Sequence, residues 1–134
     1  MLSITKSFTF HAAHRLRHPH RTDEDNQAIF GVCALPHGHT YQLQVTLCGT
    51  PDENGMILLF ENLKAIVGDA VLSRYDHADL NALAEYRAVP PTAEVMAGHI
   101  FEILAPRLAT DRYRLQEVRL YETATAWASV TADA

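Results

Sequence analysis

The sequence has few of the features that mark secreted, membrane or nucleic-acid-binding proteins. It contains no apolar run near the roughly 20 residues that cross a bilayer, so we expect no membrane partner. Only two cysteines, Cys33 and Cys48, occur in 134 residues. The amino-terminal residues do not have the pattern of a secretory signal, so we expect none. These features favour a reduced, cytoplasmic protein. The formal net charge of −5 argues against a nucleic-acid partner, because nucleic acids are bound by broad positive surfaces.

Length and composition indicate a single domain spanning residues 1–134. The hydrophobic fraction is 48% and the charged fraction is 20%, as in an ordinary protein with one buried core. The unusual feature is the presence of eight histidines in so short a chain. A metal site is therefore the first function to consider.

Alternation of apolar and polar residues predicts four strands. It is clear over residues 2–14 and over residues 41–47, where one face of each strand is apolar. Two closing strands are expected over residues 115–120 and 126–130.

Two helices are expected between the second and third strands. Apolar residues recur at helical spacing over residues 60–74, and residues 75–81 interrupt the pattern. A second helix begins after Thr92, a good N-cap residue, and ends near Pro106. Residues 15–32 are predicted to be a loop with at most a short helical turn.

This element order predicts an α+β fold. Its core is a four-stranded antiparallel sheet with two helices on one face. Such a sheet has two open edges, which proteins usually cover or pair between subunits. We therefore expect a homo-oligomer.

Three histidines, His14, His37 and His39, continue the apolar faces of the first two strands at their ends. His37 and His39 share a face and stand roughly 6.6 Å apart along an extended strand. Three neutral imidazoles with an open fourth position are typical of catalytic zinc. The alternative, three unrelated histidines, is disfavoured by the shared face and the spacing.

The remaining reactive residues each allow a functional and a structural interpretation. Cys33 is either a buried core residue or, beside a metal ion, a thiolate. Asp76 and His77 form either an acid–histidine proton-transfer pair or a helix end. Glu122 faces the apolar side of its strand, which is costly unless it meets a partner or ligand. No metal-binding or catalytic role is assigned to the other histidines, which are His11, His18, His20 and His99.

Together these motifs resemble the family of 6-pyruvoyltetrahydropterin and 6-carboxytetrahydropterin synthases. The resemblance covers nearly the whole chain. It is carried, in order, by Phe10–Leu16, Cys33–His39, Gly55–Ile57 with Phe60–Lys64, Tyr75–Asn81, Pro91–Glu94 and Glu122–Thr123. One departure is Leu59, which stands where the family usually has Asp or Asn and where a helix cap would be lost.

The resemblance implies a tunnelling fold, in which the four-stranded sheets of several subunits join into a barrel. It implies a homohexamer with sites between subunits. The zinc ligands map onto His14, His37 and His39, and the catalytic cysteine maps onto Cys33.

The resemblance also implies how the substrate is handled. The catalytic Asp–His pair maps onto Asp76 and His77, and the glutamate that anchors the pterin maps onto Glu122, which is expected to be both a catalytic and a substrate-binding residue. Thr92 joins Glu122 as a substrate-binding candidate.

The substrate implied is 7,8-dihydroneopterin triphosphate, and two products are possible. The Cys-x-x-x-His-Gly-His spacing favours 6-carboxy-5,6,7,8-tetrahydropterin synthase, on the route to queuosine. The long segment 15–32 favours the 6-pyruvoyl type, which eliminates triphosphate. A non-catalytic zinc- or pterin-binding module is the alternative of another class.

An acidic protein must hold a triphosphate by local charge. The basic residues that directly follow His14 are candidates, with a solvated loop as the alternative: Arg15, Arg17, His18, His20 and Arg21.

Overall fold

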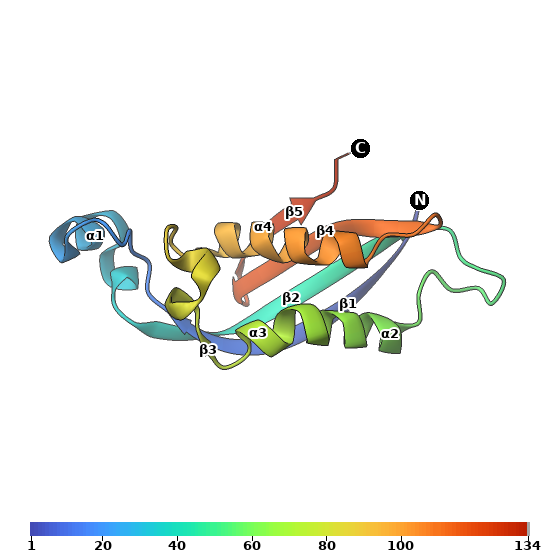
Figure 1. Ribbon diagram of the computed structural model, residues 1–134, viewed down its shortest axis with the longest axis horizontal. Coiled ribbons are helices and arrows are strands. Elements are labelled where there is room, and N and C mark those ends of the chain that lie inside the picture. Colours follow the sequence, from blue (N-terminus) through green and yellow to red (C-terminus); the bar gives the residue numbers. More distant parts are fainter. Residues whose placement is uncertain (134) are drawn as a thin grey trace.

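The computed structural model describes residues 1–133, which form one sheet with helices packed against it (Figure 1). The strand order is β3-β1-β2-β4-β5. The strands are β1 (Leu2–His14), β2 (His37–Gly49), β3 (Ala78–Asp79), β4 (Tyr113–Thr123) and β5 (Ala126–Thr131). The α+β class predicted from the sequence is confirmed.

Strands β1 and β2 pair antiparallel over their full length, from Leu2 opposite Gly49 to His14 opposite His37. This register brings the end of β1 and the start of β2 to the same edge of the molecule. The predicted histidines meet because the two long strands pair without a register shift. Strand β4 pairs with the other side of β2, and β5 pairs with β4.

The sheet has five strands, so the prediction of four was wrong by one short strand. Residues Ala78 and Asp79, placed in a helix break by the sequence, pair parallel with Ala12 and Ala13 of β1. Two residues are too few for alternation to be visible in a sequence. This short strand brings the segment after the first long helix against the end of β1.

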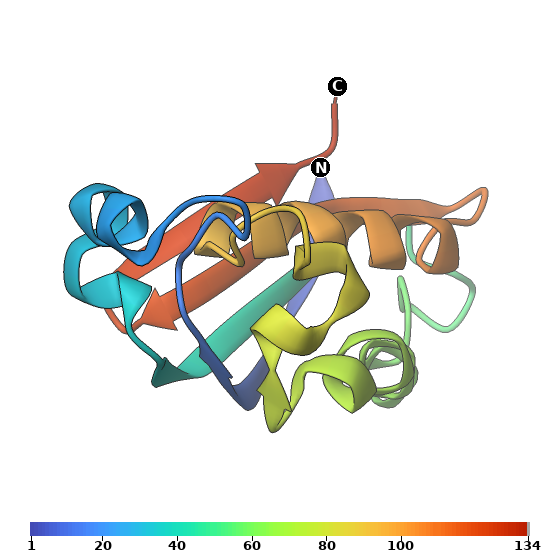
Figure 2. The ribbon, with the colours of Figure 1, turned by 60° about the vertical axis from the view of Figure 1, so that its left-hand side comes forward.

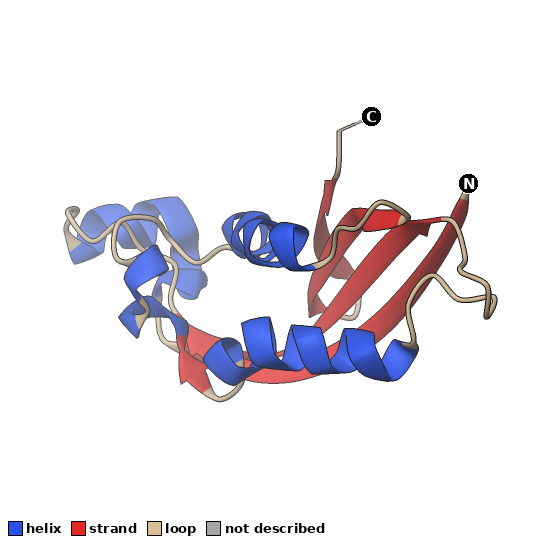
Figure 3. Cartoon of the chain, turned by 45° about the vertical axis from the view of Figure 1, so that its right-hand side comes forward, coloured by secondary structure: helices blue, strands red, loops and turns tan. Residues whose placement is uncertain are grey.

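Two helical segments cover one face of the sheet (Figure 2). The first is a continuous rod made of α2 (Phe60–Val67), a π-helical segment (Gly68–Leu72) and α3 (Ser73–Tyr75) (Figure 3). Leu59 precedes α2 and gives it no side-chain cap. The second is α4 (Ala93–Leu104), whose predicted N-cap is confirmed, since Thr92 Oγ1 accepts the Val95 N–H at 3.1 Å.

The core lies between these helices and the sheet. Even-numbered side chains of β1, such as Phe8 and Phe10, join Leu43, Leu63 and Met96 in one buried cluster. Odd-numbered residues of β1 are mostly exposed, so the opposite face of the sheet is open in the described chain. No helix within residues 1–133 has the length and apolarity needed to cross a membrane.

The segment between β1 and β2 is more ordered than predicted. It contains a full helix, α1 (Asp23–Phe30), and a 3-10 turn (Gly31–Ala34). Thr22 caps α1 by accepting the Asp25 N–H at 3.1 Å, and three acidic residues occupy the first turn. The buried Asn26 amide ties the preceding loop together through the backbone of His18. Figure 1 shows α1 at one end of the molecule, apart from the other helices.

Candidate metal and catalytic site

Three imidazoles converge where β1 ends and β2 begins. The ring centroids of His14 and His37 lie 4.6 Å apart, those of His14 and His39 lie 5.1 Å apart, and those of His37 and His39 lie 4.9 Å apart. One potential ligand atom from each ring lies within 4.8 Å of the others. The structure therefore brings together the three residues that the sequence selected.

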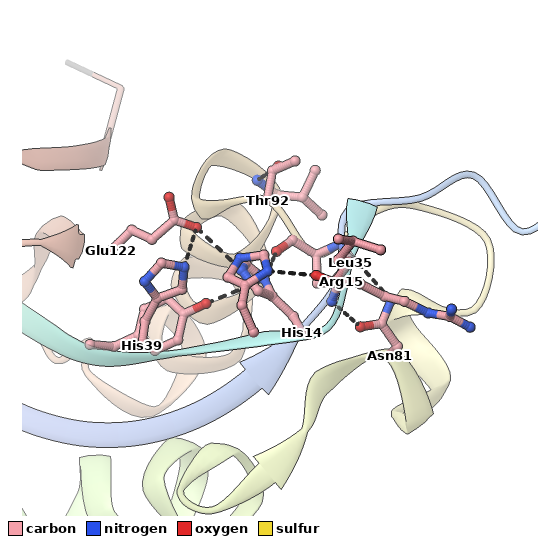
Figure 4. A network of polar contacts seen from close by, with 11 residues as sticks. His14, Arg15, Leu35, His39, Asn81, Thr92 and Glu122 are labelled. Carbon is pink, nitrogen blue, oxygen red and sulfur yellow. Dashed lines mark hydrogen bonds and ion pairs between the residues drawn. The ribbon is translucent and has the colours of Figure 1, made fainter. Parts of the chain in front are cut away.

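Backbone carbonyls orient two of these rings. Nδ1 of His14 lies 2.9 Å from the Pro91 carbonyl oxygen, and Nδ1 of His37 lies 2.8 Å from the Leu35 carbonyl oxygen. A carbonyl only accepts, so each Nδ1 carries the proton and each Nε2 keeps a free lone pair. This is the arrangement by which proteins prepare histidine for a metal. Figure 4 shows His14 close to His39 and Glu122.

The electrostatics of the site fit a metal cation. Nε2 of His14 and Nε2 of His39 are buried and have no hydrogen-bond partner among residues 1–133, which is costly for polar atoms. Burial lowers the pKa of His14 to about 4 and also lowers the pKa of His39. Both rings are therefore neutral at pH 7, the form that binds metal. Three nitrogen donors suit zinc and related divalent transition metals.

Glu122 lies against this cluster. Its Oε1 is 3.5 Å from His14 Nε2 and 3.6 Å from His39 Nε2, and its side chain is 28% exposed (Figure 4). The pairing of β4 with β5 shifts register between Tyr121 and Thr123, so Glu122 has no direct partner on β5. The carboxylate therefore lies beside the two Nε2 atoms that have no hydrogen-bond partner, where a bound cation would join them.

Cys33 lies in the 3-10 turn before β2 and is partly exposed. Its carbonyl accepts the Leu16 N–H at 2.8 Å, which fixes the turn beside the residues that follow His14. Within residues 1–133 the thiol has no hydrogen-bond partner. The turn therefore places Cys33 on the same side of the molecule as the end of β1.

Asp76 and His77 form a pair, with Oδ1 of Asp76 3.1 Å from Nδ1 of His77. Asp76 Oδ1 also accepts the His11 N–H at 3.0 Å, and this hydrogen bond is the main reason that the pKa of Asp76 lies below its usual value. His77 has a φ of 62°, the only positive φ among the described non-glycine residues. Its N–H donates to the His11 carbonyl at 2.5 Å, which holds this unfavourable conformation.

The Asp76–His77 pair lies on the opposite face of the sheet from the three histidines. The His77 ring packs edge-on against the His11 ring, with centroids 5.9 Å apart. His11 and His14 are three residues apart on β1, so their side chains point to opposite faces. Within one chain the structure does not bring His77 together with the histidine cluster.

Sequence reasoning missed two residues of this region. His11 supports the Asp76–His77 pair through its backbone, and its Nδ1 contacts Thr40 Oγ1 at 3.1 Å. The Asn81 side chain forms two hydrogen bonds with the Arg15 backbone. Its Oδ1 accepts the Arg15 N–H at 2.8 Å, and its Nδ2 donates to the Arg15 carbonyl at 2.9 Å. Nothing local in the sequence reveals either role, since both depend on the parallel β3–β1 contact.

The metal-free protein is expected to lose stability as pH falls from 6.5 toward 4. The pKa of His14 is lowered from 6.5 to about 4 by burial, so in this window the unfolded chain binds a proton that the folded chain excludes. The free energy of unfolding therefore decreases as the pH falls. The decrease is complete once the pH is below the pKa of His14 in the folded protein. Thermal unfolding in a chelator across this range measures the effect. His14→Asn should flatten the profile, and a flat wild-type profile would contradict the assignment.

Comparisons with known proteins agree with this geometry. A family model described as 6-pyruvoyl tetrahydropterin synthase matches residues 3–133. The chain is 35% identical over 124 residues to the 6-pyruvoyl tetrahydrobiopterin synthase of Drosophila melanogaster, covering 90% of this chain and 73% of that protein. It is 31% identical over 150 aligned positions to the 6-carboxy-5,6,7,8-tetrahydropterin synthase of Haemophilus influenzae, covering 95% of this chain and 96% of that protein.

A solved structure of Caenorhabditis elegans 6-pyruvoyl tetrahydropterin synthase has the same fold. It matches with a TM-score of 0.89 and 27% sequence identity, covering 98% of this chain and 96% of that chain. The tunnelling fold expected from the sequence motifs is thereby confirmed.

Proposed function

The chain belongs to the 6-pyruvoyl tetrahydropterin synthase family, and from that premise we propose that it is a zinc-dependent lyase acting on 7,8-dihydroneopterin triphosphate. The observation that carries the proposal is the convergence of His14, His37 and His39, with two buried Nε2 atoms left without partners. A structural role alone would not leave such atoms unsatisfied.

The three imidazoles would hold Zn²⁺ as neutral Nε2 donors. When bound, the ion supplies Lewis-acid chemistry, which polarises hydroxyl oxygens of the substrate side chain and acidifies the neighbouring C–H. The chain's own contribution is orientation. The carbonyls of Pro91 and Leu35 keep both Nδ1 protons in place, so His14 and His37 need no rearrangement to bind.

Cys33 is proposed to take the proton from that C–H as a thiolate. Asp76 orients His77 through the 3.1 Å contact at Nδ1, leaving His77 Nε2 to transfer a proton at the adjacent substrate carbon. Because His77 lies on the opposite face from the histidine cluster, these roles combine only if the pair comes from a neighbouring subunit. This separation supports a homo-oligomer, proposed to be a hexamer, with sites between subunits.

Glu122 and Thr92 are the proposed substrate-binding residues. The Glu122 carboxylate would accept two N–H groups from the pterin edge, a strong charge-assisted contact. Thr92 caps α4 through its side chain and follows Pro91, which orients His14. Its position beside the metal ligands supports a role in shaping the site.

Two reactions remain candidates for this site. The short spacing between Cys33 and His37 supports the 6-carboxy-5,6,7,8-tetrahydropterin synthase reaction, which cleaves the side chain and releases acetaldehyde and triphosphate. The ordered helix α1 within the long segment 15–32 supports the 6-pyruvoyl alternative, which keeps all three side-chain carbons.

Incubation of the zinc-loaded protein with dihydroneopterin triphosphate tests the proposal. Release of acetaldehyde identifies the carboxy reaction, and triphosphate release with a pyruvoyl product identifies the alternative. Cys33→Ala is the control for chemistry and should bind the substrate without converting it. Unchanged substrate with the wild-type protein would contradict the enzymatic proposal and favour a zinc- or pterin-binding module.

A further inference from the structure

A second cavity beside the histidine site is lined by three guanidinium groups. It has a volume of about 340 Å³, and its lining residues come from three separate segments: Arg15, Arg17, Pro19, Asn81, Tyr86 and Arg87. None of the lining residues carries a carboxylate. Three like charges around one cavity repel each other unless an anion joins them.

The guanidinium groups have few competing partners within the described chain. Arg15 and Arg87 form no ion pair there, and Arg17 contacts only Asp23, at 3.4 Å, whose side chain is 88% exposed. The nearby Glu85 carboxylate is already held by Arg74 through two contacts. The positive charge of the cavity is therefore largely uncompensated by the protein.

This cavity lies next to a larger one that reaches the proposed metal ligand His14. A cavity of about 570 Å³ is lined by His14 together with Arg15 and Asn81, and these last two residues also line the guanidinium cavity. The Asn81 amide holds both backbone groups of Arg15, so it fixes the Arg15 backbone where the two cavities adjoin. Figure 4 shows the Arg15 side chain on the Asn81 side of His14, pointing away from Glu122.

Asp79 is the one acidic residue that lines the larger cavity. Its carboxylate accepts the Asn81 N–H at 3.2 Å. An anionic group would therefore be repelled near Asp79 and attracted beyond Arg15. The charge distribution separates a neutral ligand portion near His14 from an anionic portion in the second cavity.

We propose that the cavity lined by Arg15, Arg17 and Arg87 binds the triphosphate tail of the substrate. The identity of the tail rests on the proposed function, whereas the affinity for a polyphosphate does not. This assignment keeps Arg15 and Arg17 from the sequence expectation, but neither His18 nor His20 lines the cavity. Arg21 does not line the cavity, and Arg87, distant in the sequence, does.

The probe for the site is inorganic tripolyphosphate, measured by titration calorimetry with the full-length protein. The double variant Arg17→Gln, Arg87→Gln should bind it roughly 100-fold more weakly, about tenfold for each charged contact removed. The salt dependence of the remaining affinity should also be flatter. Arg21→Gln removes the same charge from the same loop and should bind like the wild type. Thermal unfolding and zinc content confirm that each variant is folded.

Kinetics with dihydroneopterin triphosphate provide the second readout. The double variant should have a raised KM with an unchanged kcat, and its affinity for dihydroneopterin, which has no phosphates, should not change. Two results would contradict the assignment of this cavity as an anion site. They are no binding of tripolyphosphate by the wild-type protein, and a loss of binding in Arg21→Gln as large as that in the double variant. Selective binding of tripolyphosphate by a protein that converts no pterin would overturn the proposed function and leave the anion site standing.

Discussion

Subunits that carry Cys33→Ala, combined with subunits that carry His77→Ala, are expected to regain lyase activity that neither variant has alone. Each variant by itself should lose turnover by roughly 10²-fold or more, the usual scale for a general acid or base. In a mixed oligomer, an intact site needs Cys33 from one chain and His77 from its neighbour. Random assembly of equal amounts should restore about a quarter of the wild-type activity.

The physical reason is the geometry of β1. His77 lies against His11 on the open face, whereas His14 points to the helix-covered face. A site built within one chain would show no recovery on mixing, because every chain would carry one defect. Steady-state rates of co-expressed, separately tagged subunits provide the measurement.

A matched control uses Cys33→Ala with His37→Ala. Both residues are proposed to belong to the same half of the site, so mixing these two variants should restore nothing. Recovery in this pair would contradict the division of the site between Cys33 and His77. It would indicate that Cys33 and His37 act from different chains.

Replacement of His37 by alanine is expected to remove zinc binding. The wild-type protein should hold about one zinc per chain, and the variant should hold almost none after dialysis. Zinc at about 100 times its dissociation constant should stabilise the wild type by about 2.7 kcal/mol and leave the variant unchanged. Elemental analysis and thermal unfolding with and without zinc measure both effects.

His20→Ala is the control for this experiment. His20 is exposed and lies outside the cluster, so its loss should change neither zinc content nor the stabilisation by zinc. A wild-type protein that purifies without metal and is not stabilised by added zinc would contradict the metal assignment. Because His37 is only partly buried, its replacement should leave the core packed.

Local patterns were sufficient for much of the architecture. Alternation located the long strands β1 and β2, and the cap at Thr92 located the start of α4. Local sequence patterns did not predict elements that were too short or too polar. Strand β3 has two residues, and α1 has a largely polar sequence that gives no apolar period, although Thr22 and three acidic residues mark its beginning.

The amino-acid sequence was enough to predict the three-histidine cluster, because the alternation of side chains along β1 and β2 directs His14, His37 and His39 to one face at the strand ends. It could not determine what lies next to that cluster. The pairing of β3 with β1 brings Asn81 into contact with Arg15 and places His77 beside His11, and Arg87 lines the same cavity as Arg15. Such contacts between distant segments arise from tertiary packing, which no local pattern of residues encodes.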